Sequence, residues 1–489
     1  MNLTLFIPEI TLAVTAVLVI LLDLFVRQSY RSYVLRSVSL AGLIVAGVFS
    51  VAMWGDSHPA LFNNMLAVDN FAIFFKLLFA GTAFLVILAS ADYIRKFARF
   101  QGEYYALILI STLGMMLMAA ATDLISLFVS LELTSISLYV LVGFLKDRKS
   151  TESALKYLLL GAIASAVLLY GMTLIFGVTG QTQLAAIAQS FHETLFSAPL
   201  DNPALIMGIV LLIAGFGFKI ASVPFQMWVP DVYEGAPTTI TAYLSVASKA
   251  AGFAIIMRIF FSAFSTPFWL SHQWGIIFAV LSVISITIGN IVAIPQTNIK
   301  RMLGYSSIAQ AGYLMVGLAT FGLAMPSNLF GESGVLFFLA NYALTNLGAF
   351  IAIIVISNKI DSDMIADYAG MRKRAPLLAL ALTLCLISLI GMPPAAGFMA
   401  KFYIFSLAAK NGLLWLVIVA AVNSVISAYY YLRVVKVMWF GEAASPEKVP
   451  SSAAPRFALF LCCLGVLLLG IIPGLVMKLA ELASNMFTF

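Results

Sequence analysis

The sequence has 489 residues, of which 62% are hydrophobic and only 10% charged, and its mean hydropathy is +1.04. This composition excludes a soluble globular domain and indicates a membrane protein. A net charge of +6 is ordinary for a membrane protein with basic loops on one side. No basic run is interleaved with aromatic residues, which argues against nucleic-acid binding.

Apolar runs long enough to cross a hydrocarbon core of about 30 Å recur along the whole chain. The first run has no positively charged segment before it, so we expect it to be a retained helix and not a cleaved signal peptide. Fourteen membrane-spanning helices are predicted, at 3–25, 33–54, 70–91, 103–120, 123–145, 154–178, 204–230, 238–263, 274–294, 303–324, 334–357, 376–409, 411–440 and 456–484. The predicted fold class is an all-α polytopic membrane protein.

The Lys and Arg residues are unevenly shared between the two sides of these spans. Lys410 and Lys478 are the clear exceptions on an otherwise nearly uncharged side. The other side holds the basic connections 27–36, 95–99, 146–149, 300–301, 359–374 and 433–456. Cytoplasmic loops of membrane proteins carry the excess of Lys and Arg. We therefore expect a bacterial inner-membrane protein with its N-terminus and its C-terminus outside.

The chain divides into four predicted parts. These are an N-terminal three-helix segment (1–102), a first five-helix repeat (103–263), a second, inverted five-helix repeat (274–440) and a C-terminal helix (456–489). A repeat of five spans is odd in number, so the second copy must be inverted in the membrane.

The seventh and twelfth spans are predicted to be discontinuous. The run 376–409 would be roughly 51 Å long as a straight helix, and its centre holds Gly391, Pro393, Pro394 and Gly397. The run 204–230 carries a proline, Pro224, which removes a backbone hydrogen bond. Both runs contain the string Gly-Phe-x-x-Lys, at 215–219 and 397–401, which suggests equivalent positions in the two repeats.

Four ionisable residues, Glu132, Lys219, Lys249 and Lys401, fall near the middle of predicted spans. A charge at this depth costs at least about 2.5 to 3.5 kcal/mol, so four of them favour ion translocation. The alternative is a set of buried ion pairs that only fasten helices, although such pairs seldom stabilise more than apolar packing does. Glu132 is the only acid at this depth, so the surplus of lysines suggests that some are neutral during part of a cycle.

Other polar residues are interpreted as structural. Lys76, Lys156 and Arg258 lie near span ends, where a long side chain can reach the interface. The polar stretch 298–307, which includes Ser306 and Ser307, is expected to anchor a helix at the interface. The acidic segment 231–237 is either a proton-collecting surface or a polar turn, and we favour the turn.

No cofactor is expected in this chain. Cys385, Cys462 and Cys463 fall inside apolar runs without metal-ligand spacing, and the three histidines stand far apart.

Three long motifs closely resemble the antiporter-like subunits of respiratory complex I, and the subunit N type in particular. They are GFGFKIASVPFQMWVPDVYEGAPTTITAYLSVASKAAGF at 215–253, QTNIKRMLGYSSIAQAGY at 296–313 and GMPPAAGFMAKFYIF at 391–405. The similarity covers nearly the whole chain. A lysine at 401 is unlike the subunit M type, which has Glu at this position.

The resemblance implies a proton-translocating membrane-arm subunit of an NADH:quinone oxidoreductase. In that family, Glu132 and Lys219 would form a pair, Lys249 would connect the two halves, and Lys401 would end the relay. Subunits of the K and M types would be the neighbours in the membrane. NADH, FMN, iron–sulfur clusters and quinone would be bound by other subunits, including those of the hydrophilic redox arm.

Two other functions remain open. The chain could be a subunit of a multisubunit cation/proton antiporter, or a membrane subunit of an energy-converting hydrogenase, although the motifs favour subunit N. Co-purification distinguishes them: flavin and iron–sulfur proteins for complex I, only small hydrophobic subunits for the antiporter, and a nickel protein for the hydrogenase.

Cysteines introduced at Gly180 and Lys359 test the predicted topology. An impermeant thiol reagent is expected to label position 180 from outside and position 359 from the cytoplasm, because the bases mark the cytoplasmic side. The unsubstituted protein is the control for its three native cysteines. Labelling of both positions from one face would contradict the fourteen-span topology.

Overall fold

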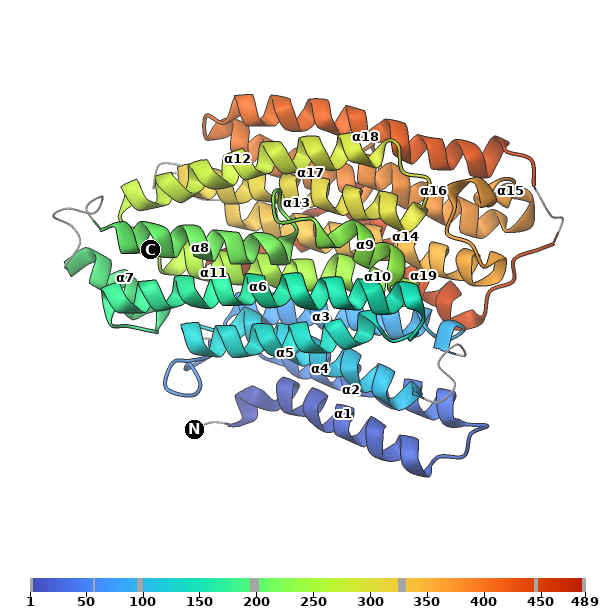
Figure 1. Ribbon diagram of the computed structural model, residues 1–489, viewed down its shortest axis with the longest axis horizontal. Helices are drawn as coiled ribbons and strands as arrows, with labels where there is room; N and C mark the ends of the chain where they lie inside the picture. Colours follow the sequence, from blue (N-terminus) through green and yellow to red (C-terminus); the bar gives the residue numbers. More distant parts are fainter. Residues whose placement is uncertain are drawn as a thin grey trace.

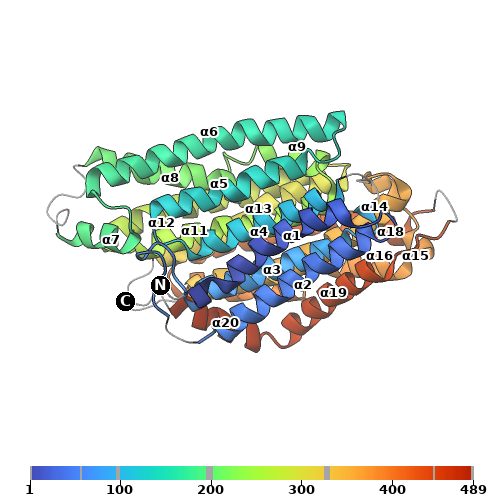
Figure 2. The ribbon, with the colours of Figure 1, turned by 90° about the horizontal axis from the view of Figure 1, so that it is seen from below.

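The computed structural model describes residues 3–55, 58–94, 100–193, 202–323, 331–443 and 447–485. The described residues form helices, turns and a few isolated bridges. The long helices run side by side in one elongated bundle, and both ends of the chain lie at the same end of it (Figures 1 and 2). The basic segment 95–99 lies outside the described residues.

The helices follow the predicted spans closely. The first segment contains η1 (Leu3–Phe6), α1 (Ile7–Phe25), α2 (Arg31–Ala52) and α3 (Asn70–Ala89). Next come α4 (Gln101–Ala120), α5 (Leu124–Val142), α6 (Arg148–Thr179), α7 (Leu184–Glu193), α8 (Pro203–Ile220), α9 (Trp228–Gly235), α10 (Thr238–Tyr243), the π-helical η4 (Leu244–Ser248) and α11 (Lys249–Ser262).

The second half has the same all-helical character. It contains α12 (Phe268–Ala293), α13 (Ile299–Leu323), α14 (Gly331–Ile360), η5 (Ile365–Tyr368), α15 (Met371–Arg374), α16 (Pro376–Ile390), α17 (Ala396–Lys410) and α18 (Leu414–Phe440). The chain closes with α19 (Ala453–Ile471) and α20 (Gly474–Ser484). Among the described residues, 13 helices are long and apolar enough to span a membrane, and α16 with α17 supplies the twelfth predicted span in two shorter pieces. The predicted all-α polytopic fold is confirmed.

Two features were not predicted from the sequence. The predicted span 456–484 is divided into α19 and α20, because Pro473 cannot continue the hydrogen bonding of α19. The connection after α6 contains the short helix α7, which buries Leu184, Ile187 and Phe191 at helical spacing. At ten residues, α7 is too short to cross the membrane.

The two predicted helix breaks have the same backbone form. After α8, Ala221 adopts the left-handed conformation (φ 62°), and its N–H bonds back to the last turn of the helix. After α16, Gly391 does the same with φ 90°. Pro224 follows the first break and Pro393 and Pro394 follow the second, which prevents either helix from continuing.

The string Gly-Phe-x-x-Lys does not mark equivalent positions around these breaks. Lys219 precedes its break and lies in the last turn of α8, whereas Lys401 follows its break and lies inside α17. The match between the two strings therefore does not support the predicted five-helix repeats. The boundaries of the two five-helix repeats stay a prediction.

Burial decreases from the centre of the bundle outward. The most apolar stretch of Thr238–Ser262 is 100% buried, and those of α13 and α14 are 94% and 89% buried. The most apolar stretches of α6 and α19 are only 33% buried. Figure 2 shows these two helices on opposite outer faces of the bundle. The segment that carries Lys249 thus occupies the interior.

Two ion pairs join helices of the first segment to each other and to the centre of the bundle. Lys76 of α3 pairs with Glu9 of α1 at 2.6 Å, and both side chains are 2% exposed. Arg258 of α11 pairs with Asp69 at 2.6 Å and also donates to the carbonyl of Ala119. Burial disfavours a charged Asp69, but the charge and hydrogen bonds of Arg258 outweigh it and lower the pKa of Asp69. The expectation that Lys76 and Arg258 extend to the interface is wrong, because each side chain is itself buried and bonded to a carboxylate.

Gly397 provides a test of the second break. A Cβ atom at this position would lie 1.8 Å from the carbonyl oxygen of Ser388, so Gly397→Ala must separate α17 from α16. We expect a cost of about 1–3 kcal/mol or more and a lower melting temperature of the purified protein.

Gly81→Ala is the matched control, because a Cβ atom there meets nothing within 4 Å. Alanine also favours a helix over glycine by about 1 kcal/mol. Equal melting temperatures for the two variants would contradict the close contact at Gly397.

Candidate proton-transfer site

Glu132 on α5 and Lys219 on α8 lie in the same region of the bundle. Each forms its hydrogen bond with a serine hydroxyl and not with the other. Ser165 of α6 donates a hydrogen bond to Glu132, and Lys219 donates to Ser135, which lies one turn after Glu132 on α5. Among the described residues, no carboxylate lies within 4.0 Å of Lys219 Nζ. The predicted pair is thus close in space without being a direct ion pair.

Lys249 is held at the centre of the bundle by Ser307 of α13. Its Nζ donates to both the carbonyl and the Oγ of Ser307. Ser307 Oγ also accepts from Tyr342 at 3.2 Å and lies 3.2 Å from the hydroxyl of Tyr233. The expectation that Ser307 only anchors a helix at the interface is therefore wrong.

Lys401 bonds to the end of the preceding helix. Its Nζ donates to the carbonyls of Leu389 (3.1 Å) and Ile390 (2.9 Å) and to Ser424 Oγ (2.9 Å), and it lies 4.3 Å from the ring centre of Tyr313. The last carbonyls of a helix have no partner within the helix and carry partial negative charge. The break in the twelfth span therefore creates the acceptors that hold Lys401.

All three lysines lie at interruptions of helices. Lys219 is in the last turn of α8, Lys249 directly follows the π-helical η4, and Lys401 caps the end of α16. They are 7%, 2% and 5% exposed, respectively. Each finds uncharged oxygen atoms as hydrogen-bond acceptors within the bundle.

A small cavity lies between Lys401 and the group around Lys249. Its lining includes Lys401, Gln310, Asn341 and Tyr342, and its volume is about 10 Å³, which is close to the space that one water needs. The Oδ1 atom of Asn341 is buried and accepts no hydrogen bond from the described residues. Since Tyr342 also bonds to Ser307, one bridging molecule would join Lys401 to the partner of Lys249.

Both acidic residues of the segment 231–237 form ion pairs. Asp231 pairs with Lys156 (2.9 Å) and Arg301 (2.7 Å), and Glu234 pairs with Lys149 (2.8 Å) and Arg301 (3.1 Å). Burial opposes ionisation of both acids, but these bases outweigh it and lower the pKa of each carboxyl. Residues 231–235 lie in α9, so the expected polar turn is wrong for them, and the ion pairs join this short helix to α6 and α13.

Some of these partners were visible in the sequence and others were not. Ser135 follows Glu132 by three residues, a spacing that places both on one helix face. The contacts of Lys249 with Ser307 and of Lys401 with Ser424 join different helices, and no local pattern marks them. A bundle with a central row of buried lysines at helix breaks is the architecture of an antiporter-like membrane protein.

Comparisons with known proteins agree with this class. Residues 121–427 match the family NADH:quinone oxidoreductase/Mrp antiporter, TM. NADH-quinone oxidoreductase subunit N of Dehalococcoides mccartyi is 52% identical over 486 residues, which cover 99% of each chain. The chain therefore belongs to the family of NADH-quinone oxidoreductase subunit N.

Solved structures share the fold. A chain of respiratory complex I from Thermus thermophilus with bound aureothin has a TM-score of 0.79 at 32% identity, covering 96% of this chain and 98% of that one. A chain of the Mrp complex from Dietzia sp. has a TM-score of 0.84 at 21% identity, covering 100% and 98%. The second likeness concerns the fold alone.

Ser307 is the contact to test at this site. In the NADH-quinone oxidoreductase that contains this chain, Ser307→Ala should lower quinone reductase activity severalfold, up to about tenfold, because Lys249 loses its hydroxyl link to Tyr342. Ser306→Ala is the matched control, since Ser306 bonds to Tyr431 and not to a lysine. Equal activities of the two variants would remove Ser307 from the site.

Proposed function

We propose that this chain translocates protons as a membrane subunit of NADH-quinone oxidoreductase. The observation that carries the proposal is the row of buried lysines, Lys219, Lys249 and Lys401, each with uncharged hydrogen-bond acceptors at a helix interruption. A cation with a fixed carboxylate partner is held in its charged form, whereas a lysine among hydroxyls and carbonyls can exchange its proton. The site is built for reversible protonation.

In this relay Glu132 and Lys219 take the first position. Lys219 bonds to Ser135 on the helix that carries Glu132, so a small movement of α5 against α8 would change the interaction of the carboxylate with the ammonium group. Lys249 connects the two halves through Ser307 and Tyr342, and Lys401 is the terminal residue. The two halves differ, since no carboxylate among the described residues lies near Lys401 as Glu132 lies near Lys219.

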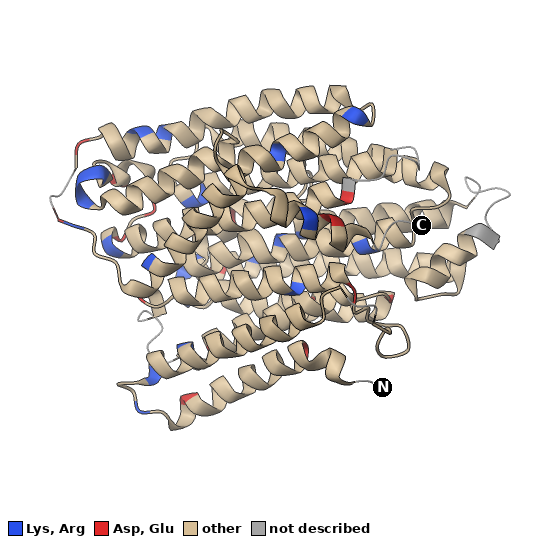
Figure 3. Ribbon diagram, turned by 180° about the vertical axis from the view of Figure 1, so that it is seen from behind, with Lys and Arg blue, Asp and Glu red and all other residues tan. Residues whose placement is uncertain are grey.

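The direction of transfer follows from the distribution of bases. Figure 3 shows Lys and Arg gathered at one end of the bundle, opposite to the end where the chain begins and finishes. By the positive-inside rule this end is cytoplasmic, which places both termini outside the inner membrane of a bacterial cell. A cavity of about 330 Å³ at the basic end, lined by Glu234, Thr238, Lys300 and Asp363, lies beside the helix that carries Tyr233.

The relay contains no redox group, so it requires partners. Quinone reduction would occur in other subunits, with NADH, FMN and iron–sulfur clusters bound in the hydrophilic arm. Subunits of the K and M types would flank this chain in the membrane, on the sides of Glu132 and Lys401. The alternative function is that of a subunit of a multisubunit cation/proton antiporter. The chain of the Mrp complex has the same fold but is only 21% identical in sequence, whereas a subunit N is 52% identical.

Lys401 distinguishes a proton carrier from a fixed charge. Arginine keeps the positive charge but cannot be deprotonated in a protein, so Lys401→Arg should fail as Lys401→Ala does. We expect proton pumping and quinone reductase activity in sealed vesicles to fall at least about tenfold in both variants. Electron transfer from NADH to an artificial acceptor should be unchanged, which shows that the redox arm is intact, and the complex should migrate at its full size on a native gel.

The contrary outcome is specific. If Lys401→Arg pumps like the parent while Lys401→Ala does not, Lys401 contributes charge alone and the carrier role is wrong.

A further inference from the structure

An apolar groove lies on the outer surface between α16 and α19. Its volume is about 680 Å³. Leu377, Leu380 and Leu384 of α16 form one wall, and Phe460 and Leu467 of α19 form the other. Leu377, Leu380 and Phe460 are 75%, 56% and 60% exposed, so no other part of the described chain covers the groove.

The mouth of the groove is strongly basic. Arg374, Lys448 and Arg456 line it, and none of the lining residues is acidic. Arg374 and Arg456 donate to backbone carbonyls of the connection between α18 and α19. Among the described residues, none of the three bases has a carboxylate within 4.0 Å. Three positive charges therefore face one opening without compensation.

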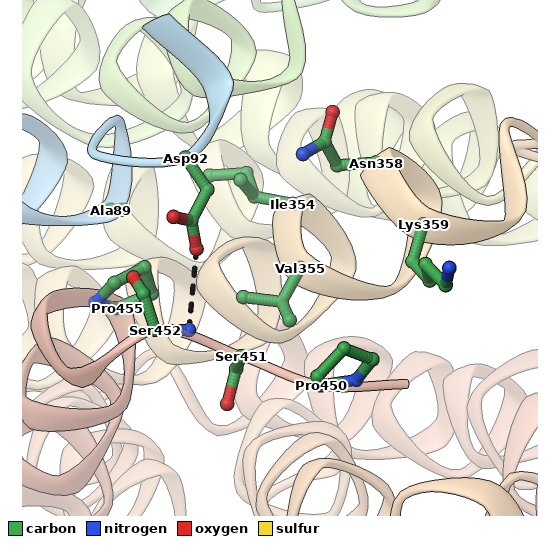
Figure 4. Close-up of a pocket in the computed structure, with 10 residues that line it drawn as sticks. All are labelled: Ala89, Asp92, Ile354, Val355, Asn358, Lys359, Pro450, Ser451, Ser452 and Pro455. Atoms are coloured by element: carbon green, nitrogen blue, oxygen red, sulfur yellow. Dashed lines mark hydrogen bonds between the residues drawn. The ribbon is translucent and has the colours of Figure 1, made fainter. Parts of the chain in front are cut away.

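The connection that carries Lys448 is held in place from both sides. Arg374 Nε donates to the carbonyl of Glu447 at 2.9 Å, and the N–H of Val449 donates to the carbonyl of Arg374 at 3.2 Å. On its other side, the N–H of Ser452 donates to Asp92 (Figure 4), in a separate cavity of about 560 Å³. The basic mouth is thus a fixed feature of the fold.

The dimensions of the groove match one leaflet of a bilayer. From Arg456 to Leu467, α19 rises by about 16 Å, and half of the hydrocarbon core is about 15 Å thick. Arg374 ends α15, which Figure 1 shows at the end of the bundle opposite to the two chain ends. Lys448 and Arg456 line the same mouth, and the leucines follow along α16 and α19. A ligand that fills this groove has a negative head and an apolar tail about one leaflet long.

We infer that the groove between α16 and α19 binds an anionic glycerophospholipid, with its phosphate at Arg374, Lys448 and Arg456 and an acyl chain along the leucines. Basic pockets between spans on the cytoplasmic side favour anionic headgroups. A free phosphate would leave the apolar walls unfilled, and a zwitterionic lipid would bring a cationic group, beside its phosphate, toward three positive charges. The site is independent of the proposed proton relay.

The test compares two lipids with the same acyl chains. The complex that contains this chain is stripped of lipid in detergent, mixed with phosphatidylglycerol or phosphatidylcholine, and the lipid bound to this chain is counted by native mass spectrometry. We expect phosphatidylglycerol to bind roughly tenfold more tightly, with a preference that weakens as salt is raised. Equal binding of the two lipids would overturn the inference.

Matched variants locate the binding. R374Q/K448Q/R456Q should lose about one phosphatidylglycerol per chain, whereas R27Q/R148Q/K436Q, with the same change of net charge at exposed bases elsewhere, should lose none. Equal loss in both triple variants would indicate general charge attraction and would overturn the site.

A second arm tests the apolar walls with the charges intact. Leu380→Trp fills the groove and should release the same lipid, while Leu432→Trp on the exposed face of α18 should not. Retention of phosphatidylglycerol by Leu380→Trp, or crosslinking of the groove to a helix of another subunit, would overturn the inference. This arm also decides the question if the triple variant does not assemble.

Discussion

Lys401 takes its hydrogen-bond acceptors from the end of a helix that stops inside the membrane. Unpaired backbone carbonyls are costly in a hydrocarbon core, so an interrupted span survives only where other groups in the protein bond to the freed carbonyls. Leu389 and Ile390 have such carbonyls, and the ammonium group of Lys401 donates a hydrogen bond to each. Gln310 and Ser424 also donate to these two carbonyls, so three side chains stabilise the break, whereas Lys401 depends on the break for two of its acceptors.

The buried cations of the bundle have two kinds of hydrogen-bond partner. Lys76 and Arg258 have direct carboxylate partners: the Lys76 pair joins α3 to α1, and the Arg258 pair joins α11 to the start of α3. Removing one partner of such a pair typically costs about 3–5 kcal/mol, which suits a permanent contact. Lys219 and Lys249 have serine oxygens instead, whose dipoles hold an ammonium group without fixing its charge. The partner, more than the depth, separates the structural cations from those proposed to carry protons.

The sequence predicts the spans and the sites of the breaks because both depend on local properties. Apolar runs define the spans, and Pro224 or the pair Pro393 and Pro394 stop a helix wherever they occur. The contact between Lys249 and Ser307 depends on how α11 meets α13, and a single sequence carries no sign of that meeting. The string Gly-Phe-x-x-Lys misleads for the same reason, since it reports residue order and not the side of the break on which each lysine lies.

The π-helical segment Leu244–Ser248 makes the length of the chain matter as much as its composition. A π-helical turn holds more residues than an α-helical turn, so η4 stores extra residue length directly before Lys249. Each residue of an α-helix advances the side chains by about 100°. A one-residue deletion before η4 that left the π turn in place would turn Lys249 away from Ser307 by that angle, although every polar group would still be present. A deletion within η4 itself would remove the extra residue and return the segment to a regular α-helix, with Lys249 close to its present side of the helix.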